Sequence, residues 1–358
     1  MLHEDADLLV VDKPAGMSTH APDASRRDDV VSRLQRWLAT RDGTTPEAQY
    51  LGIHQRLDRD TSGALLFARR REANKNLAAA FEGRRVAKVY VAVVQRTRRG
   101  ERHGTLTHDL VPDADGRMRV ASPRERSKRA QRAVTRWREL ARQGDRSLLE
   151  LRPETGRTHQ LRVQCAAEGM PLAGDTLYDG APAPRLMLHA RSLTLAHPSR
   201  GADVSFSAPV PRVFEAWMRG EPDPASLDEL IARAADARWS LADDPGTTAF
   251  RLAHDGDALP GCTVDLYHDY AVASFFGPAS DPSVLDALAR AGVRGTYVKL
   301  RPKHASTLVD TRREDVAPAH ASRGDDAPAE FTVTESGLTY LVRLGDGLST
   351  GIFLDQRE

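Results

Sequence analysis

The distribution of charge along this chain of 358 residues limits its possible folds more than any other feature. Residues 1–220 carry 38 Lys and Arg against 27 Asp and Glu, a net charge of +11. Residues 221–358 carry 13 against 23, a net charge of −10. Pro222 and Pro224 lie where the sign changes, as in a linker. We therefore expect one domain over residues 1–219, a linker over 220–227 and a second domain over 228–358.

The basic first part is suited to a polyanionic partner such as nucleic acid. Of the 51 basic residues only six are Lys, and Arg is the better residue for bidentate phosphate contacts and for stacking on bases. A genome-wide preference for Arg would also explain that ratio, but not the separation of charge. Residues 84–102 and 117–146 are the most basic stretches, and we expect them to contact the backbone of such a polyanion. The alternative is an ordinary solvated surface.

Composition and cysteine content exclude several classes of protein. Apolar residues make up 40% of the chain and charged residues 28%, which is typical of a soluble globular protein. No apolar run approaches the roughly 18 residues that a membrane span needs, and residues 1–5 do not resemble a signal peptide. Cys165 and Cys262 have no metal-ligand spacing and read as small buried hydrophobic residues. We therefore expect a cytoplasmic protein that does not associate with membranes.

Hydrophobic periodicity predicts a mixed α+β first domain. We expect strands at 8–11, 64–68, 86–94, 147–152, 186–195 and 204–206, and helices at 28–39, 72–82 and 158–168, the last with Thr158 as its N-cap. In the strand at 86–94, alternation puts Lys88 and Tyr90 on the face opposite to Val89 and Val91.

The second domain is expected to be a smaller α/β unit. Its predicted helices cover 226–239 and 282–291, and its strands lie near 250 and at 263–266, 270–276 and 295–300. Residues 311–329 are polar and rich in Ala and Pro, which favours a flexible loop. Phe331–Thr334 and Leu338–Leu344 read as a hairpin.

The segment His54–Gly63, with the sequence HQRLDRDTSG, is the densest cluster of chemically active residues. Asp58 lies between Arg56 and Arg59, so we expect an ionised carboxylate at neutral pH. Such a group can act as a base, a nucleophile or a metal ligand. Taken alone, the segment would equally fit a charged turn between two strands.

The whole string resembles the catalytic motif of the RluA-type RNA pseudouridine synthases. Four further segments resemble other motifs of that family in the same order: 10–16 (VVDKPAG), 88–90 (KVY), 155–163 (TGRTHQLRV) and 186–198 (LMLHARSLTLAHP). The resemblance covers residues 1–215. It implies the pseudouridine synthase fold, a mixed and mainly antiparallel sheet with flanking helices and a central cleft.

The resemblance also implies roles for individual residues. The catalytic residues would be Asp58, which opens the glycosidic bond, Tyr90, which stacks on the uracil and could help to remove the proton from the new carbon–carbon centre, and Arg162, which pairs with Asp58. The substrate-binding residues would be Arg56, Lys88, Arg157 and His159. The reaction consumes no external reagent, so neither a cofactor nor a metal is expected. In the family a His directly precedes the Arg of the motif, whereas here Gln55 separates His54 from Arg56.

The second region resembles the middle domain of RNA cytosine-5 methyltransferases, in segments 247–252, 259–265, 331–337 and 350–357. In those enzymes the last segment precedes the domain that binds S-adenosylmethionine, and here the sequence ends at Glu358, so we expect no S-adenosylmethionine binding by this chain. The main hypothesis is an RNA pseudouridine synthase, acting as a monomer on ribosomal or transfer RNA. The alternatives are a fragment of a bifunctional synthase and methyltransferase, or a non-catalytic RNA-binding protein.

Overall fold

Two units, each built on its own sheet, make up the chain: Met1–Pro224 and Ala225–Glu358. Their boundary falls inside the segment 220–227 that the sequence marks as a linker. The computed structural model describes residues 1–21, 29–95, 100–113, 117–122, 125, 130–254, 259, 261–301 and 314–354. Among these residues, no helix combines the length and the apolar character needed to cross a lipid bilayer.

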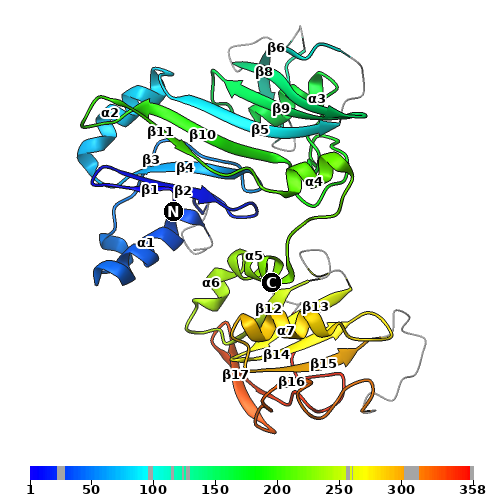
Figure 1. Ribbon diagram of the computed structural model, residues 1–358. Coiled ribbons are helices and arrows are strands. Elements are labelled where there is room, and N and C mark those ends of the chain that lie inside the picture. Colours follow the sequence, from blue (N-terminus) through cyan, green and yellow to red (C-terminus); the bar gives the residue numbers. More distant parts are fainter. Residues whose placement is uncertain are drawn as a thin grey trace. The chain divides into compact units, whose positions relative to one another are not determined.

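The first unit is organised around a mixed sheet of eleven strands (Figure 1). Along the main path the order is β1-β2-β4-β10-β5-β9-β8-β6-β7, while β3 pairs with β4 and β11 pairs with β10. The strands are β1 His3–Glu4, β2 Leu8–Lys13, β3 Gly52–Ile53, β4 Ser62–Ala68, β5 Ala87–Gln95, β6 His103–Pro112, β7 Met118–Val120, β8 Gln131–Gln143, β9 Arg146–Pro153, β10 Leu188–Ala196 and β11 Asp203–Ser207. The β10–β4 pair is parallel and the other pairs are antiparallel.

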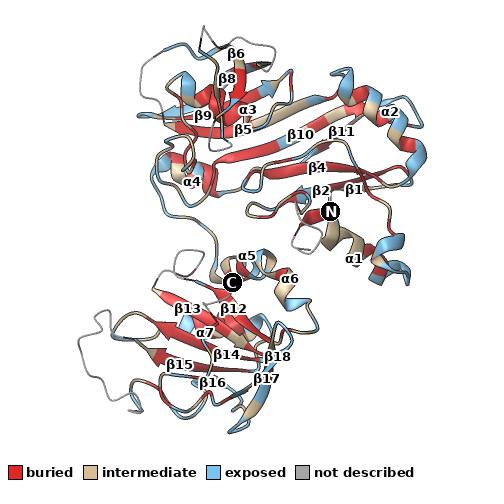
Figure 2. Cartoon of the chain, turned by 180° about the vertical axis from the view of Figure 1, so that it is seen from behind, coloured by how far each residue is buried: buried red, intermediate tan, exposed pale blue. Residues whose placement is uncertain are grey.

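The centre of this sheet is covered on both faces. All seven residues of β4 are buried (Figure 2), which agrees with its continuous apolar run rather than an alternating one. Strand β10 passes so close to β4 that a Cβ atom at Gly63 would lie 2.2 Å from the carbonyl oxygen of Ala190. Gly63 also has φ of +115°. Only glycine satisfies both conditions, so the end of the HQRLDRDTSG segment is tied to β10.

Helices cover the sheet where the strands present apolar faces. They are α1 Val30–Asp42, α2 Arg71–Glu82, α3 Gln160–Ala167 and α4 Val213–Arg219, with a short 3₁₀ helix at Pro46–Ala48. Helix α2 packs Leu77 against Leu8 and Leu66. Helix α3 packs Leu161 against the face of β5 that carries Tyr90, and α4 packs on the opposite face of β5. The alternation predicted for residues 86–94 is confirmed.

The predicted N-cap of the helix at 158–168 is wrong. Helix α3 begins at Gln160, and its N-cap is His159, which has φ of +52° and forms no side-chain cap. The side chain of Gln160 instead fixes the turn before the helix, because its Oε1 accepts the N–H of Arg157 at 3.0 Å. The amide of Gln160 also donates to Thr135 Oγ1 on β8 at 2.9 Å, so the helix start is anchored to the sheet.

The basic region favours a hairpin around residues 113–116, and the antiparallel pair of β6 and β7 confirms it. The long strand β8 was not predicted, and it changes the interpretation of the basic stretch 117–146. In the described part of this stretch, arginines on the outer face pair with carboxylates: Arg136 with Glu154 at 2.6 Å and Arg138 with Glu150 at 2.9 Å. Each of these arginines therefore has a carboxylate partner that would compete with a phosphate. Residues 96–99, 123–124 and 126–129, which carry much of the expected RNA-contacting charge, lie outside the described residues.

The second unit is a five-stranded sheet in the order β12-β13-β14-β15-β16, with a two-stranded sheet, β17–β18. Its elements are α5 Leu227–Ala237, α6 Trp239–Ala242, β12 Ala249–Ala253, β13 Cys262–Tyr267, β14 Tyr270–Phe275, α7 Pro282–Arg290, β15 Gly295–Leu300, β16 Arg323–Gly324, β17 Phe331–Glu335 and β18 Leu338–Val342. Only the β14–β15 pair is parallel. The unit is therefore mainly antiparallel, unlike the α/β unit that the sequence suggests.

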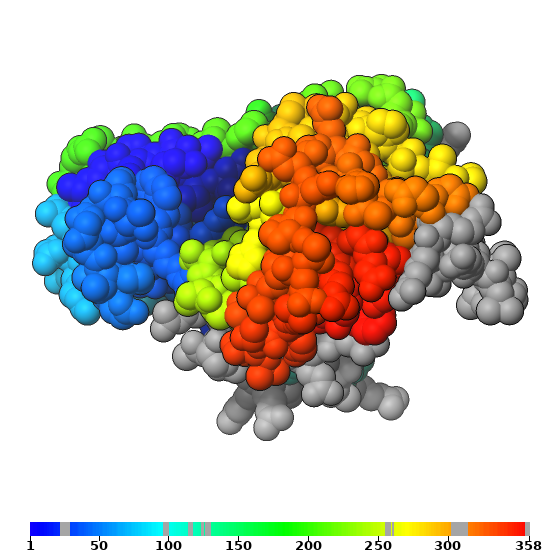
Figure 3. Space-filling view, turned by 90° about the horizontal axis from the view of Figure 1, so that it is seen from below, coloured from blue at the N-terminus to red at the C-terminus, as the bar shows by residue number. Residues whose placement is uncertain are grey.

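Most elements predicted for the second unit are confirmed, including the hairpin of β17 and β18. The flexible loop expected at 311–329 is partly wrong, because β16 lies within it and forms the edge of the sheet; residues 311–313 lie outside the described residues. The red stretch after β18 lies at the surface against orange segments (Figure 3). Arg301 holds this stretch by donating to the carbonyl of Leu348 at 3.2 Å. Both cysteines are buried and free, as predicted.

Candidate active site

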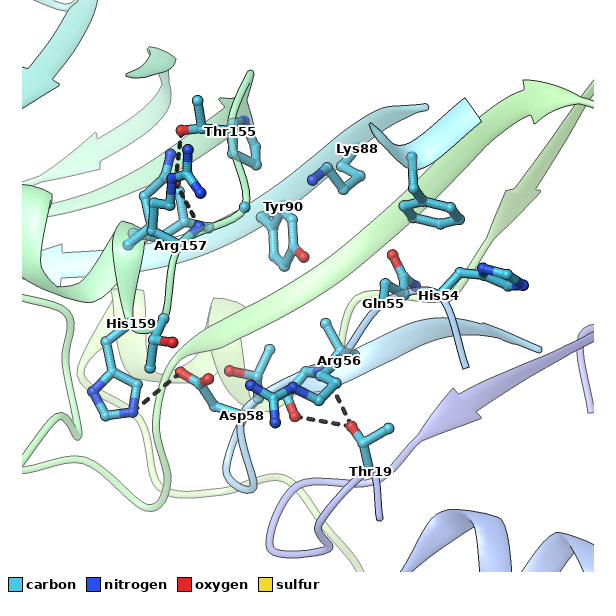
Figure 4. A pocket seen from close by; sticks show the side chains of 18 of the residues that line it. Thr19, His54, Gln55, Arg56, Asp58, Lys88, Tyr90, Thr155, Arg157 and His159 are labelled. Carbon is cyan, nitrogen blue, oxygen red and sulfur yellow. Dashed lines mark hydrogen bonds and ion pairs between the residues drawn. The ribbon is translucent and has the colours of Figure 1, made fainter. Parts of the chain in front are cut away.

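A cavity of about 870 Å³ opens in the first unit where three segments meet. The loop between β3 and β4 contributes Asp58, strand β5 contributes Lys88 and Tyr90, and the turn from β9 into α3 contributes residues 153–159 (Figure 4). All seven site residues predicted from the sequence line this one cavity: Arg56, Asp58, Lys88, Tyr90, Arg157, His159 and Arg162. Segments that are distant in the sequence thus form one polar cleft.

The loop that carries Asp58 is held from below by the turn that follows β2. The buried ammonium of Lys13 donates to the carbonyls of Pro14, Met17 and Arg59, at 2.8, 2.5 and 2.8 Å. The hydroxyl of Thr19 donates to the carbonyl of Leu57 at 2.9 Å and accepts its N–H at 3.1 Å. Because these bonds flank Asp58 on both sides, they fix its backbone while its side chain projects into the cavity.

The carboxylate of Asp58 faces two nitrogen-bearing side chains of the α3 segment. Nη1 of Arg162 lies 3.4 Å from Asp58 Oδ2, and Nε2 of His159 lies 4.0 Å from the same oxygen (Figure 4). The side chain of Asp58 is 30% exposed, so a ligand in the cavity can reach it.

Arg162 has a stronger partner than the one predicted for it. Its Nε and Nη2 atoms each donate to a carboxylate oxygen of Asp175 at 2.7 Å, and only the longer contact of Nη1 goes to Asp58. Burial alone would lower the pKa of Arg162, but the bonds to both carboxylates outweigh it and raise the pKa. The guanidinium is thus a fixed positive charge that links a buried Asp to the Asp in the cleft.

Tyr90 and Lys88 point into the cavity from one face of β5 (Figure 4). Burial, and then the charge of Asp58, raise the pKa of Tyr90 above its usual value. The side chain is therefore a neutral phenol at neutral pH. Burial lowers the pKa of Lys88. An added Cβ atom at Gly156 would lie 3.6 Å from Lys88 Nζ, an ordinary van der Waals contact, so the ammonium lies directly beside the β9–α3 turn.

The remaining predicted residues lie around the rim. Arg56 is exposed, and Nε of Arg157 donates to the carbonyl of Arg132 at 3.3 Å. His54 points away from Asp58 (Figure 4): its Nε2 lies 2.9 Å from Asn74 Oδ1, and its ring stacks on Phe81 with the centroids 6.0 Å apart. Because Gln55 separates it from Arg56, His54 lies at the end of the cavity away from Asp58.

Comparison with known proteins gives a consistent result for this part of the chain. Residues 7–167 match the family model described as RNA pseudouridylate synthase. An uncharacterized RNA pseudouridine synthase of Zymomonas mobilis is 36% identical over 223 residues, which are 60% of this chain and 94% of that protein. The chain belongs to the RNA pseudouridine synthase family.

Two further relatives agree with this assignment. The ribosomal large subunit pseudouridine synthase D of Xanthomonas campestris is 35% identical over 66% of this chain and 71% of its own length. The solved structure of human RNA pseudouridylate synthase domain containing 4 is 26% identical, with a TM-score of 0.50, and covers 61% of this chain and 91% of that one. The shares of this chain that the two relatives cover, 66% and 61%, are close to the share that the first unit, Met1–Pro224, occupies.

Sequence reasoning missed four residues that shape the site of this synthase: Lys13, Thr19, Asp175 and Tyr178. Lys13 is the last residue of β2 and follows the exposed Asp12, so strand alternation could have placed its side chain on the buried face. Asp175 and Tyr178 lie between Gly174 and Gly180, in a turn-forming segment that holds two acids and one aromatic residue. Nothing local in the sequence indicates that Asp175 contacts Arg162.

One possible metal-binding group exists within the described ranges, and it lies outside the cavity of the synthase. Asp5, Asp7 and His197 have ligand atoms within 4.8 Å of one another. Their atoms are already engaged, since Asp5 Oδ2 is 3.0 Å from both His197 Nε2 and Arg200 Nη2, and Asp7 pairs with Arg70. This cluster ties the β1–β2 turn to the end of the β10–β11 hairpin.

Proposed function

We propose that this RNA pseudouridine synthase isomerises uridines in structured RNA through the carboxylate of Asp58. The observation that carries the proposal is the position of this carboxylate: it is a partly exposed acid in the large cavity, held by bonds at Leu57 and Arg59 and facing Arg162 and His159. A pinned carboxylate beside a fixed positive charge is suited to act on a bound sugar or base.

The reaction converts one glycosidic bond into another. The bond from ribose to a uracil nitrogen breaks, the uracil turns, and a ring carbon forms the new bond to the same ribose carbon. The proton lost from that ring carbon balances the one gained by the nitrogen, so no external reagent is consumed. Asp58 would open the first bond, by attacking the ribose, by attacking the base or by removing a ribose proton.

The surrounding residues would divide the work of holding the uridine. Because a uridine inside a helix cannot reach Asp58, it has to leave its stack, at a cost of about a few kcal/mol that is smallest in loops and bulges. Tyr90 would stack on the extruded uracil, and Arg56 would occupy the gap left in the RNA. Lys88, Arg157 and His159 would bind the nucleotide from the other side of the cavity.

Ribosomal RNA is the substrate class that the relatives support. Three of them, from Xanthomonas campestris, Pseudomonas aeruginosa and Haemophilus ducreyi, carry the name ribosomal large subunit pseudouridine synthase D. We propose large-subunit ribosomal RNA as the substrate of this chain, with transfer RNA as the alternative that a test must separate.

For the second unit we propose a methyltransferase-type accessory role without S-adenosylmethionine binding in this chain. The segments that carry the resemblance lie in β12, at β13 and in the β17–β18 hairpin. The part of the chain after residue 220 has a net charge of −10, which makes it poorly suited to hold RNA by itself. Positioning the synthase unit, or binding another protein, suits this charge better.

The test compares Asp58→Asn with Asp60→Asn on unmodified RNA. The first substitution should abolish pseudouridine formation while folding and RNA binding stay close to wild type, since only one oxygen is replaced. Asp60 is exposed and does not line the cavity, so Asp60→Asn should retain most of the activity. Substantial turnover by purified Asp58→Asn would refute the role of Asp58.

A further inference from the structure

A tight turn at residues 174–180 lies behind the proposed active site. Backbone bonds close it, from the N–H of Gly180 to the carbonyl of Asp175 at 2.8 Å and from the N–H of Gly174 to the carbonyl of Ala181 at 2.7 Å. A Cβ atom at Gly180 would lie 1.9 Å from the carbonyl oxygen of Leu172, so only glycine fits there. The turn is therefore a rigid platform for the side chains that it presents.

Two side chains of this turn contact the two residues that face Asp58. Asp175 binds Arg162 through two bonds of 2.7 Å. Tyr178 places its hydroxyl oxygen 2.8 Å from Nδ1 of His159, with the two rings edge to face at an interplanar angle of 85°. The contact with Tyr178 leaves Nε2 as the nitrogen of His159 that points toward Asp58.

The direction of the bond between Tyr178 and His159 follows from a third group. The backbone N–H of Met118 on β7 lies 3.2 Å from the hydroxyl oxygen of Tyr178. A backbone N–H can only donate, so the tyrosine oxygen is the acceptor in this bond. The oxygen could accept a second bond, but Nδ1 of His159 is the one acceptor that the described residues offer to the hydroxyl proton of Tyr178, so both groups are satisfied when Tyr178 donates to Nδ1. An imidazole that accepts at Nδ1 carries its own proton on Nε2.

We infer that Tyr178 holds His159 as the neutral Nε2–H tautomer, and that this N–H is a catalytic hydrogen-bond donor to a sugar oxygen of the uridine bound at Asp58. The inference rests on the proposed function and adds a residue role to it. The separation of 4.0 Å between Nε2 and Asp58 Oδ2 is too long for a direct hydrogen bond. A ligand oxygen near the reacting carbon would lie between the two groups.

The surroundings of His159 agree with a neutral ring. Among the described residues, the charged and titratable groups that face it are Asp58 from the β3–β4 loop, Arg162 on α3, and Asp175 and Tyr178 from the turn. Strand β7 contributes the backbone N–H of Met118, which binds Tyr178. Burial lowers the pKa of His159, and Arg162 adds to this, while Asp58 opposes it.

The first test needs no RNA and no turnover. In nitrogen NMR spectra of the histidine-labelled full chain, His159 should show the Nε2–H tautomer, with its signals assigned by their loss in His159→Gln. In Tyr178→Phe the tautomer preference should weaken, and the ring should protonate at a pH higher by about one unit, the shift that one hydrogen bond of ordinary strength produces. An Nδ1–H tautomer in the wild type, or an unchanged titration in Tyr178→Phe, would overturn the inference even if the chain is an active synthase.

The second test separates a donor role from a structural one. A Gln amide can present an N–H near the position of Nε2, whereas an Asn amide reaches only the position of Nδ1. His159 has φ of +52°, a conformation that Asn tolerates better than Gln. A purely structural role would therefore favour His159→Asn. We expect His159→Gln to retain at least tenfold more pseudouridine formation than His159→Asn, and equal or reversed activities would contradict a donor at Nε2.

Discussion

Arg162 is a single residue that links Asp58 in the cleft to Asp175 in the interior. Asp175 is fully buried and both of its oxygens bond to Arg162. Removing the guanidinium would leave a buried carboxylate without its counter-charge, a change that destabilises proteins by about 3–5 kcal/mol. It would also remove the positive charge that faces Asp58. Stability and turnover are therefore coupled at this position.

We predict that Arg162→Met lowers the free energy of unfolding by about 3–5 kcal/mol and lowers kcat more than it weakens RNA binding. Arg162→Lys retains the charge but cannot form the bidentate pair, so it should fall between the wild type and Arg162→Met in both measurements. Denaturant unfolding and single-turnover kinetics check this. A variant that binds RNA poorly but turns over normally would show that Arg162 acts on affinity alone.

Among the structural elements, the turn after β2 determines the position of the loop that carries Asp58. Lys13 satisfies three backbone carbonyls from two segments, and it is completely buried. The backbone N–H of Gly16 also donates to the carbonyl of Arg59, at 2.9 Å, so two bonds join the turn to the loop at this point. The segment VVDKPAG therefore acts as a clamp on the loop that presents Asp58.

We predict that Lys13→Met lowers the free energy of unfolding by at least ~2 kcal/mol, because it leaves buried carbonyls without donors, and that it reduces kcat through a displaced loop. Lys75→Met is the matched control, since Lys75 is exposed on α2. Thermal unfolding and turnover should be nearly unchanged in the control. Equal effects in the two variants would show that the clamp does not position the loop.

Elements with strong periodicity could be predicted from the sequence, and contacts between distant elements could not. The strand at 86–94 alternates clearly, so the side of Lys88 and Tyr90 was predictable from it. The long strand β8 was not predictable, because the arginines on its exposed face resemble a polar loop in the sequence. Only the folded structure shows that Glu150 and Glu154 lie opposite these arginines. The bond between Lys13 and Arg59 spans 46 residues, and periodicity reports the face of an element rather than its partner.

RNA binding involves the surface of the whole molecule, and the structure changes where we expect the phosphate contacts to lie. Arg84 and Arg157 line the cavity, and neither forms an ion pair with a carboxylate in the part of the chain that the structure describes. Arg136 and Arg138, on the outer face of β8, are paired. The cavity rim, rather than this outer face, is therefore the expected site of phosphate contacts.

We predict that Arg84→Gln with Arg157→Gln weakens RNA binding and reduces the salt dependence of the logarithm of affinity by about 1.4–1.8, since each lost phosphate contact contributes about 0.7–0.9. Arg136→Gln with Arg138→Gln changes the net charge by the same amount and serves as the control, with a slope close to wild type. Binding measured over a range of salt concentrations decides between the two. An equal loss of slope in both pairs would point to a diffuse charge effect.

The central claim is that this chain forms pseudouridine in RNA through Asp58. The most direct measurement is a pseudouridine map of total RNA from cells with the gene, without it, and complemented with wild type or Asp58→Asn. The account predicts that specific sites in large-subunit ribosomal RNA disappear without the gene, return with the wild type and do not return with Asp58→Asn. An identical map with and without the gene, or full restoration by Asp58→Asn, would contradict it.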